Sequence, residues 1–121
     1  GARSLWESDP TPLGPLVETL VQAAIRAHNL AVHYYRDHRD PDNRRSTVLE
    51  VDFIAERVDG KVLPVESKFR KKIALEDAAP VLHFMDRYDA RHGVMVTREL
   101  FHYDAIQKLL FIPLQDFLLA F

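Results

Sequence analysis

The stretch EVDFIAERVDGKVLPVESKF, residues 50–69, predicts a β-hairpin and decides the fold of the chain. Two runs rich in alternating apolar residues, about 48–57 and 61–69, flank the pair Asp59-Gly60. An Asp-Gly pair between such runs is the strongest short-range signal of a hairpin turn, because both residues tolerate the positive φ that the turn requires. The sequence therefore predicts two adjacent antiparallel strands.

Each predicted strand divides its side chains between two faces, because side chains alternate along a strand. The first strand places on one face Leu49, Val51, Phe53 and Ala55, and on the other Val48, Glu50, Asp52 and Ile54. The second places on one face Val65, Ser67 and Phe69, and on the other Pro64, Glu66 and Lys68. The charged residues Asp52, Glu66 and Lys68 are thus predicted to project to one side, with Asp52 nearly opposite Lys68 or Phe69.

The remaining sequence predicts a mixed α/β domain around this hairpin. The expected elements are a helix from Pro15 to about His28, a strand over 30–36, a charged loop over 37–46, a helix over about 78–88, strands over 94–96 and 109–114, and a short C-terminal helix. A helix between the third and fourth strands implies that these two strands are parallel. The polar stretch 98–108 is predicted to contain no strand.

Composition limits the classes of function. The 121 residues are expected to form one domain over 13–121, preceded by an arm or linker over 1–12, and to be a fragment of a longer protein. A net charge of -2 argues against a broadly basic nucleic-acid-binding surface but allows a local basic strip. The absence of cysteine excludes disulfides and thiolate metal sites. Since no apolar run approaches the roughly 18 residues that span a bilayer, we expect a cytoplasmic protein with no membrane partner.

The three charged residues of the hairpin suit a divalent cation. Carboxylate oxygens are ligands that Mg²⁺ and Mn²⁺ prefer, and a neighbouring lysine can position a bound water or offset negative charge. Glu18, on the edge of the first helix, is a candidate fourth member of the site. The alternative is structural: Asp52, Glu66 and Lys68 could form cross-strand ion pairs, and Glu18 could be a solvated edge residue.

The pattern of a helix glutamate, a strand aspartate and Glu-x-Lys on the next strand resembles the PD-(D/E)xK nuclease superfamily. The blocks LGPLVETLV, YYRD, EVDFIAERVDGKVLPVESK, GVMVTRE and FIPLQDFLL also resemble the domain of unknown function that follows the ATPase module in prokaryotic AAA-type ATPases. The resemblance covers roughly residues 12–121. Val51 stands where the superfamily name has proline, and Ser67 where an apolar residue is commoner.

This resemblance implies a restriction-endonuclease-like core: helix, three-stranded antiparallel meander, helix and parallel strand, with an extra C-terminal strand and helix. It implies a magnesium-dependent nuclease in which Asp52, Glu66 and the Ser67 carbonyl hold Mg²⁺ (or Mn²⁺) and Lys68 orients the attacking water. Glu18 would complete the metal shell or hold a second ion. The implied substrate is nucleic acid, DNA rather than RNA, and the implied partner is an upstream ATPase module.

The densest basic cluster follows the hairpin directly. Arg70, Lys71 and Lys72 could hold phosphates beside the metal, and Arg44 and Arg45 could extend this strip; a solvated strand end is the alternative. Two other functions stay open for the whole domain. One is a catalytically inactive module that binds nucleic acid or docks on its ATPase, and the other is an oligomerisation domain.

Overall fold

The computed structural model describes residues 13–70 and 72–120. Within them the chain forms, in order, α2 (Leu13–Ala27), β1 (Ala31–His38), β2 (Val48–Glu56), β3 (Val62–Lys68), the 3-10 turn η1 (Leu75–Ala78), α3 (Ala79–Tyr88), β4 (Gly93–Thr97), β5 (His102–Asp104), β6 (Leu109–Pro113) and α4 (Leu114–Ala120). The predicted arm over 1–12 lies outside the described residues. The fold is mixed α/β, as predicted.

All six strands belong to one sheet in the order β1-β2-β3-β4-β6-β5. The strands β1, β2 and β3 form an antiparallel meander, and β3 pairs parallel to β4, which confirms the predicted crossover through α3. The strand β6 also runs parallel to β4. The prediction of no strand over 98–108 was wrong, because β5 pairs antiparallel with β6. Three residues are too few for a period of two to be visible in the sequence.

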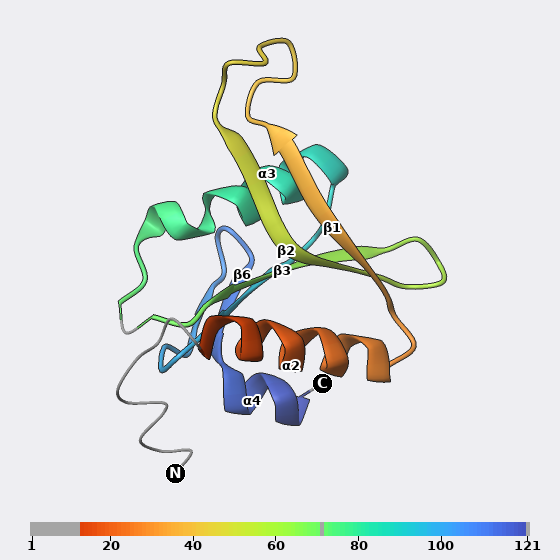
Figure 1. Cartoon of the computed structure of the whole chain (residues 1–121), viewed down its shortest axis with the longest axis vertical. Coiled ribbons are helices and arrows are strands. Elements are labelled where there is room, and N and C mark those ends of the chain that lie inside the picture. Colours follow the sequence, from red (N-terminus) through yellow and green to blue (C-terminus); the bar gives the residue numbers. More distant parts are fainter. Residues whose placement is uncertain (1–12, 71, 121) are drawn as a thin grey trace.

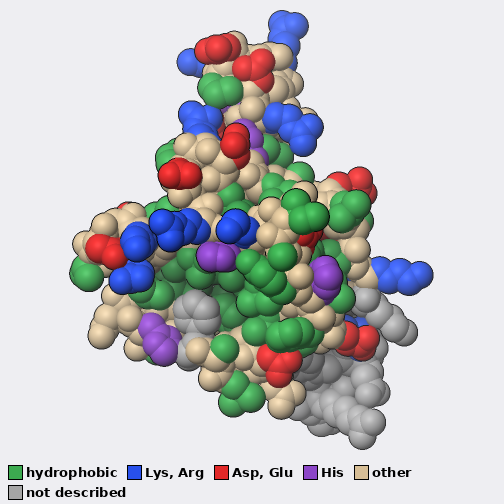
Figure 2. Space-filling view, turned by 180° about the vertical axis from the view of Figure 1, so that it is seen from behind, with side chains coloured by type: hydrophobic (Ala, Val, Ile, Leu, Met, Phe, Trp, Pro, Cys, Tyr) green, Lys and Arg blue, Asp and Glu red, His purple; other side chains and the backbone are tan. Residues whose placement is uncertain are grey.

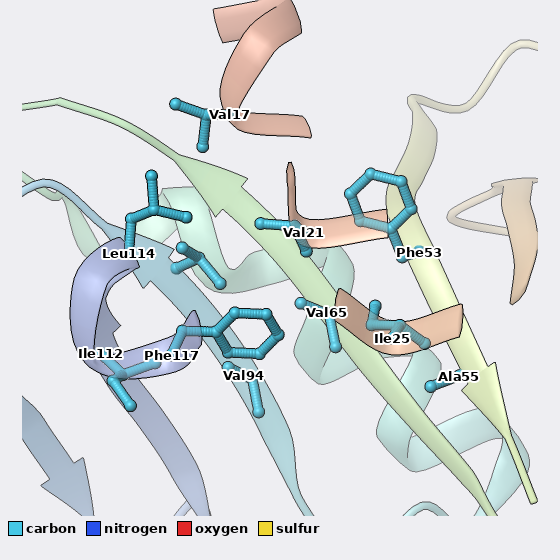
Figure 3. Packing of buried hydrophobic residues seen from close by; sticks show 11 residues of the cluster. Val17, Val21, Ile25, Phe53, Ala55, Val65, Val94, Ile112, Leu114 and Phe117 are labelled. Atoms are coloured by element: carbon cyan, nitrogen blue, oxygen red, sulfur yellow. The ribbon is translucent and has the colours of Figure 1, made fainter. Parts of the chain in front are cut away.

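Helices cover both faces of the sheet, with α2 and α4 on one face and α3 on the other (Figure 1). The core on the α2 side contains Val17, Val21 and Ile25 of α2, spaced four residues apart so that they fall on one helical face. Figure 3 shows these side chains meeting Phe53, Val65 and Val94 of the sheet and Phe117 of α4.

The core on the α3 side contains Val81 and Phe84 of α3 together with Met95 and Phe111 of the sheet. Every residue of β4 is buried, since Val94 and Val96 contribute to one core and Met95 to the other. This explains why β4 is a continuous apolar run and not an alternating one. No helix within the described ranges is long and apolar enough to cross a membrane.

Candidate carboxylate and lysine site

A β-bulge in β2 positions Asp52. His33 of β1 pairs with Ile54, whereas Tyr35 pairs with Val51, so two steps along β1 correspond to three along β2. The extra residue lies at Asp52 and Phe53. Bulges locally break the ladder and turn a side chain in a new direction, and they are frequent beside active sites.

The bulge corrects the predicted face of β2. Val51 belongs to the core on the α3 side, whereas Phe53 and Ala55 belong to the core on the α2 side. The prediction that these three residues share one face was therefore wrong, because the inserted residue reverses the alternation. The predicted register was also wrong: Phe53 pairs with Val65, so the same register places Asp52 opposite Glu66 and not opposite Lys68 or Phe69.

The side chains of Asp52 and Glu66 meet where the β2–β3 ladder ends. The backbone N–H of Ser67 donates to Asp52 Oδ2 at 2.9 Å, so a carboxylate takes the place of a strand carbonyl as acceptor. Glu66 in turn is hydrogen-bonded to both the side chain and the backbone of Asp52. These contacts tie the two carboxyl groups together at the carboxyl end of β3.

Glu66 is a buried carboxyl group whose pKa is raised far above its ordinary value. It is only 4% exposed, on a strand that lies between two others. Burial, then the hydrogen bond to the Asp52 side chain, then the Asp52 charge raise the pKa of Glu66 to about 9, against a smaller lowering by Lys68 and the Asp52 backbone. Glu66 therefore carries a proton at neutral pH when no cation is bound, and that proton satisfies the hydrogen bond between the two carboxyl groups.

Glu18 and Lys68 complete the set of charges. The first turns of α2 lie beside the carboxyl end of β3 (Figure 1), which brings Glu18 within electrostatic reach of the pair. The Glu18 residue is exposed, yet partial desolvation of its carboxyl and then the charge of Asp52 raise its pKa, while Lys68 lowers it. Lys68 is the last residue of β3, half-buried, and forms no ion pair with any described residue. The side chains of the four candidate site residues thus lie close enough to interact electrostatically.

The described residues contain no group of three or more acidic or histidine side chains that could hold a metal ion together. Two paired carboxylates nevertheless fit Mg²⁺, which usually binds one or two carboxylates and completes its octahedron with waters and substrate phosphates. The buried Glu66 carboxyl, in contact with the Asp52 carboxyl, would also be relieved of charge repulsion by a divalent cation. The donor set therefore suits a metal bound jointly with substrate.

The predicted basic strip is only partly beside this site. Arg70 follows β3 and forms an ion pair with Asp77 at 3.5 Å, Lys72 is exposed, and Lys71 lies outside the described residues. Arg44 and Arg45 are exposed and belong to the loop between β1 and β2, which projects away from the rest of the sheet (Figure 1). The structure does not join them into one strip.

Arg98 is a candidate that the sequence interpretation missed. It directly follows Thr97, the parallel partner of Lys68, and it lines a hollow of about 520 Å³ together with Leu20 and Phe69. Arg98 forms no ion pair with a described residue. The block GVMVTRE contains it, but its place beside Phe69 at the end of β3 follows only from the register of two strands that are distant in sequence.

Comparison with known proteins gives one match. No curated protein and no solved structure matches the chain. Residues 13–117 match a family whose description is Domain of unknown function (DUF4143), and this match begins at α2 and ends within α4. It includes every described element from α2 to β6, the first part of α4, and all four residues of the candidate site. The chain therefore belongs to the DUF4143 family.

Proposed function

We propose that this domain is a metal-dependent nuclease that hydrolyses phosphodiester bonds of nucleic acid, DNA rather than RNA. The observation that supports the proposal most is the hydrogen-bonded pair of Asp52 and buried Glu66 near the carboxyl end of β3, with Glu66 two residues before Lys68. Burying the Glu66 carboxyl against a second carboxyl group destabilises a fold. A function that requires them there explains why they are present.

Asp52 and Glu66, with the Ser67 carbonyl, would hold Mg²⁺ or Mn²⁺, and Glu18 would complete the shell or hold a second ion. The ion would lower the pKa of a bound water and stabilise charge on a phosphoryl oxygen. Lys68 would orient the water, since its ammonium forms no ion pair with a described residue. The order of the elements, with a helix, a meander, a helix and a parallel strand, supports a restriction-endonuclease-like core.

The substrate contacts would come from cations at the same end of the sheet. Arg70, Lys71 and Lys72 lie shortly after β3 in the sequence and would meet phosphates, together with Arg98 directly after β4. Arg44 and Arg45, in the loop between β1 and β2, would contact a second part of a long nucleic acid. We further propose that the domain works beside an upstream ATPase module in the cytoplasm, as the family resemblance implies.

The test is cleavage of labelled single- and double-stranded DNA and RNA with Mg²⁺ or Mn²⁺, with the ATPase module supplied and Asp52→Ala as the blank. We expect the natural sequence to cleave DNA and Asp52→Ala to cleave no substrate. Lys68→Ala should lower the rate by roughly two orders of magnitude, the usual effect of removing one electrostatic stabiliser of a transition state. Lys68→Ala should reduce DNA binding far less, because Arg70 and Lys72 remain.

The proposal of a nuclease is refuted if the natural sequence cleaves no substrate faster than Asp52→Ala does. The second candidate is then a catalytically inactive module of the same fold that binds nucleic acid or docks on the ATPase. The lack of a group of three metal-holding side chains in the described part of the chain favours this candidate. Thermal melting with Mn²⁺ separates the two, since a cation that binds the folded state alone raises the melting temperature.

A further inference from the structure

A second concave surface lies at the opposite end of the sheet from the carboxylates. Two adjoining hollows of about 440 and 510 Å³ share the loop between α3 and β4, which precedes the first residue of β4. The turn between β2 and β3 bounds one hollow, and the turn between β5 and β6 bounds the other. We refer to the two hollows together as the turn trough, and its principal side chains are Lys61, Asp86, Asp89, Arg91, His92 and Lys108.

Three cations of the turn trough have no ion-pair partner among the described residues: Lys61, Arg91 and Lys108. Arg57 at the hairpin turn, in contrast, pairs with Asp59 at 3.2 Å. Figure 2 shows Lys and Arg side chains in a row that begins over the tip of the β2–β3 hairpin. Cationic side chains that line a hollow and form no ion pair with a described residue can bind negatively charged groups of a ligand.

Apolar side chains of the same turns are also exposed. Val58, in the hairpin turn, is fully exposed at 106%, and Ile106, in the turn before β6, is 94% exposed. Tyr88 and Tyr103 are half-exposed, and the ring of Tyr103 lies 6.4 Å from that of His92, centroid to centroid. Exposed aliphatic and aromatic side chains next to charged ones are the composition of a protein interface.

The turn trough is poorly suited to a phosphodiester backbone. Asp86 and Asp89 line it beside the cations. The helix α3 ends there, with the N–H groups of Asp89 and Ala90 both donating to the Met85 carbonyl, and the carboxyl end of a helix carries a partial negative charge. The regularly spaced phosphates of a nucleic acid would lie near these negative groups as well as near the cations. A protein segment can instead carry carboxylates opposite the cations and uncharged side chains opposite the aspartates.

We propose that the turn trough docks a partner protein through a segment that carries both carboxylates and apolar side chains. Its carboxylates would pair with Lys61, Arg91 and Lys108, and its apolar side chains would cover Val58 and Ile106. The three turns are already ordered: the Gly93 N–H donates to the Lys108 carbonyl at 3.1 Å, and Asp104 Oδ1 accepts from the N–H groups of Ile106 and Gln107. An ordered surface loses little conformational entropy on binding.

The test uses a phage-displayed library of random 12-residue peptides panned on the immobilised 121-residue chain. Phage that also bind the variant Lys61→Glu/Arg91→Glu are removed. We expect the remaining peptides to combine Asp or Glu with Leu, Ile or Phe. A synthesised, labelled peptide should bind the natural sequence in fluorescence polarisation, and the double variant should weaken its binding at least tenfold. Ile106→Ser should also weaken binding, although it changes no charge.

The matched control is Arg26→Glu/Arg39→Glu, which reverses two exposed arginines outside the turn trough. This control should leave peptide binding unchanged, and circular dichroism should show that all variants are folded. The proposal is overturned if no peptide depends on Lys61 and Arg91, or if the control loses binding equally. It is also overturned if labelled single-stranded DNA, and no peptide, loses binding in Lys61→Glu/Arg91→Glu. None of these outcomes depends on whether the domain cleaves nucleic acid, so this test is independent of the proposed nuclease function.

Discussion

At the scale of single residues, Glu66 explains most of the chemistry of the candidate site. Its carboxyl is buried against Asp52, and its pKa of about 9 is far above the ordinary value of 4.5. Between these two pH values the folded chain holds a proton that the unfolded chain releases. The free energy of unfolding must therefore fall as pH rises through this window.

Glu66→Gln should remove this pH dependence. The amide keeps the shape of the protonated carboxyl and cannot ionise, so the variant should lack the loss of stability that Glu66 causes in the natural sequence, at most about 1.4 kcal/mol per pH unit. Urea unfolding at pH 5, 7 and 9 measures the effect, and the variant should be the more stable protein at pH 9. A variant less stable by more than about 2 kcal/mol at pH 9 would instead identify a structural pair.

Metal binding should depend on the same proton. A cation between Asp52 and Glu66 must displace it, so affinity for Mn²⁺ should rise by up to about tenfold per pH unit below pH 9. The increase in melting temperature with Mn²⁺ at pH 6, 7 and 8 measures this, and titration calorimetry in two buffers counts the released proton. Asp52→Asn is the control and should lose the response. An equal response in Asp52→Asn would place the cation elsewhere.

At the scale of elements, the bulge in β2 and the close packing of α3 on β4 set the geometry. The bulge lets Val51 and Phe53 enter opposite cores while Asp52 leaves the ladder to bind the Ser67 N–H. The helix α3 approaches β4 at Gly93, where a Cβ would lie 2.5 Å from Val81 Cγ1 and 2.8 Å from Met85 Sδ. Glycine is needed there for space.

Gly93→Ala should therefore destabilise the domain by about 1–3 kcal/mol, the usual cost of overpacking a core. Urea unfolding measures the change, and Val81→Ala in the same chain should recover part of it. Gly60→Ala is the control. A Cβ at Gly60 has no atom within 4 Å, but its φ of +86 strains any other residue, so Val81→Ala should not relieve that loss. Additive effects of Gly93→Ala and Val81→Ala would contradict the assigned contact.

At the scale of the whole molecule, the C-terminal helix belongs to the same core as the first helix. Phe117 of α4 is 1% exposed and shares a core with Val21 of α2 and Val94 of β4 (Figure 3). The α2 and α4 helices together close one face of the sheet. Unfolding of one should therefore accompany unfolding of the other.

Phe117→Ala should cost about 3–5 kcal/mol, as other removals of a buried aromatic ring do. Leu119→Ala on the same helix is the control, since Leu119 is 79% exposed and should change stability by less than about 0.5 kcal/mol. Urea unfolding followed by far- and near-ultraviolet circular dichroism measures both. Two separate transitions in the natural sequence would contradict a single core that includes α4.

The sequence by itself determined the elements whose signals are local. The Asp59-Gly60 turn, the four-residue spacing of Val17, Val21 and Ile25, and the apolar run of β4 each depend on residues close together in the chain. The parallel pairing of β3 and β4 also followed, because a helix between two adjacent strands of one sheet reverses the chain twice. Family membership followed from the same ordered blocks.

Only the tertiary structure decided what depends on pairing between distant segments. The bulge at Asp52 exists because β1 pairs with β2, and it reversed the predicted face of Val51. The strand β5 forms by pairing with the edge of β6. Arg98 lies beside Phe69 because β4 pairs with β3. The raised pKa of Glu66 follows from its burial and then from its contact with Asp52 on the neighbouring strand. Such features arise from register and burial, which a one-residue shift changes and which no local pattern encodes.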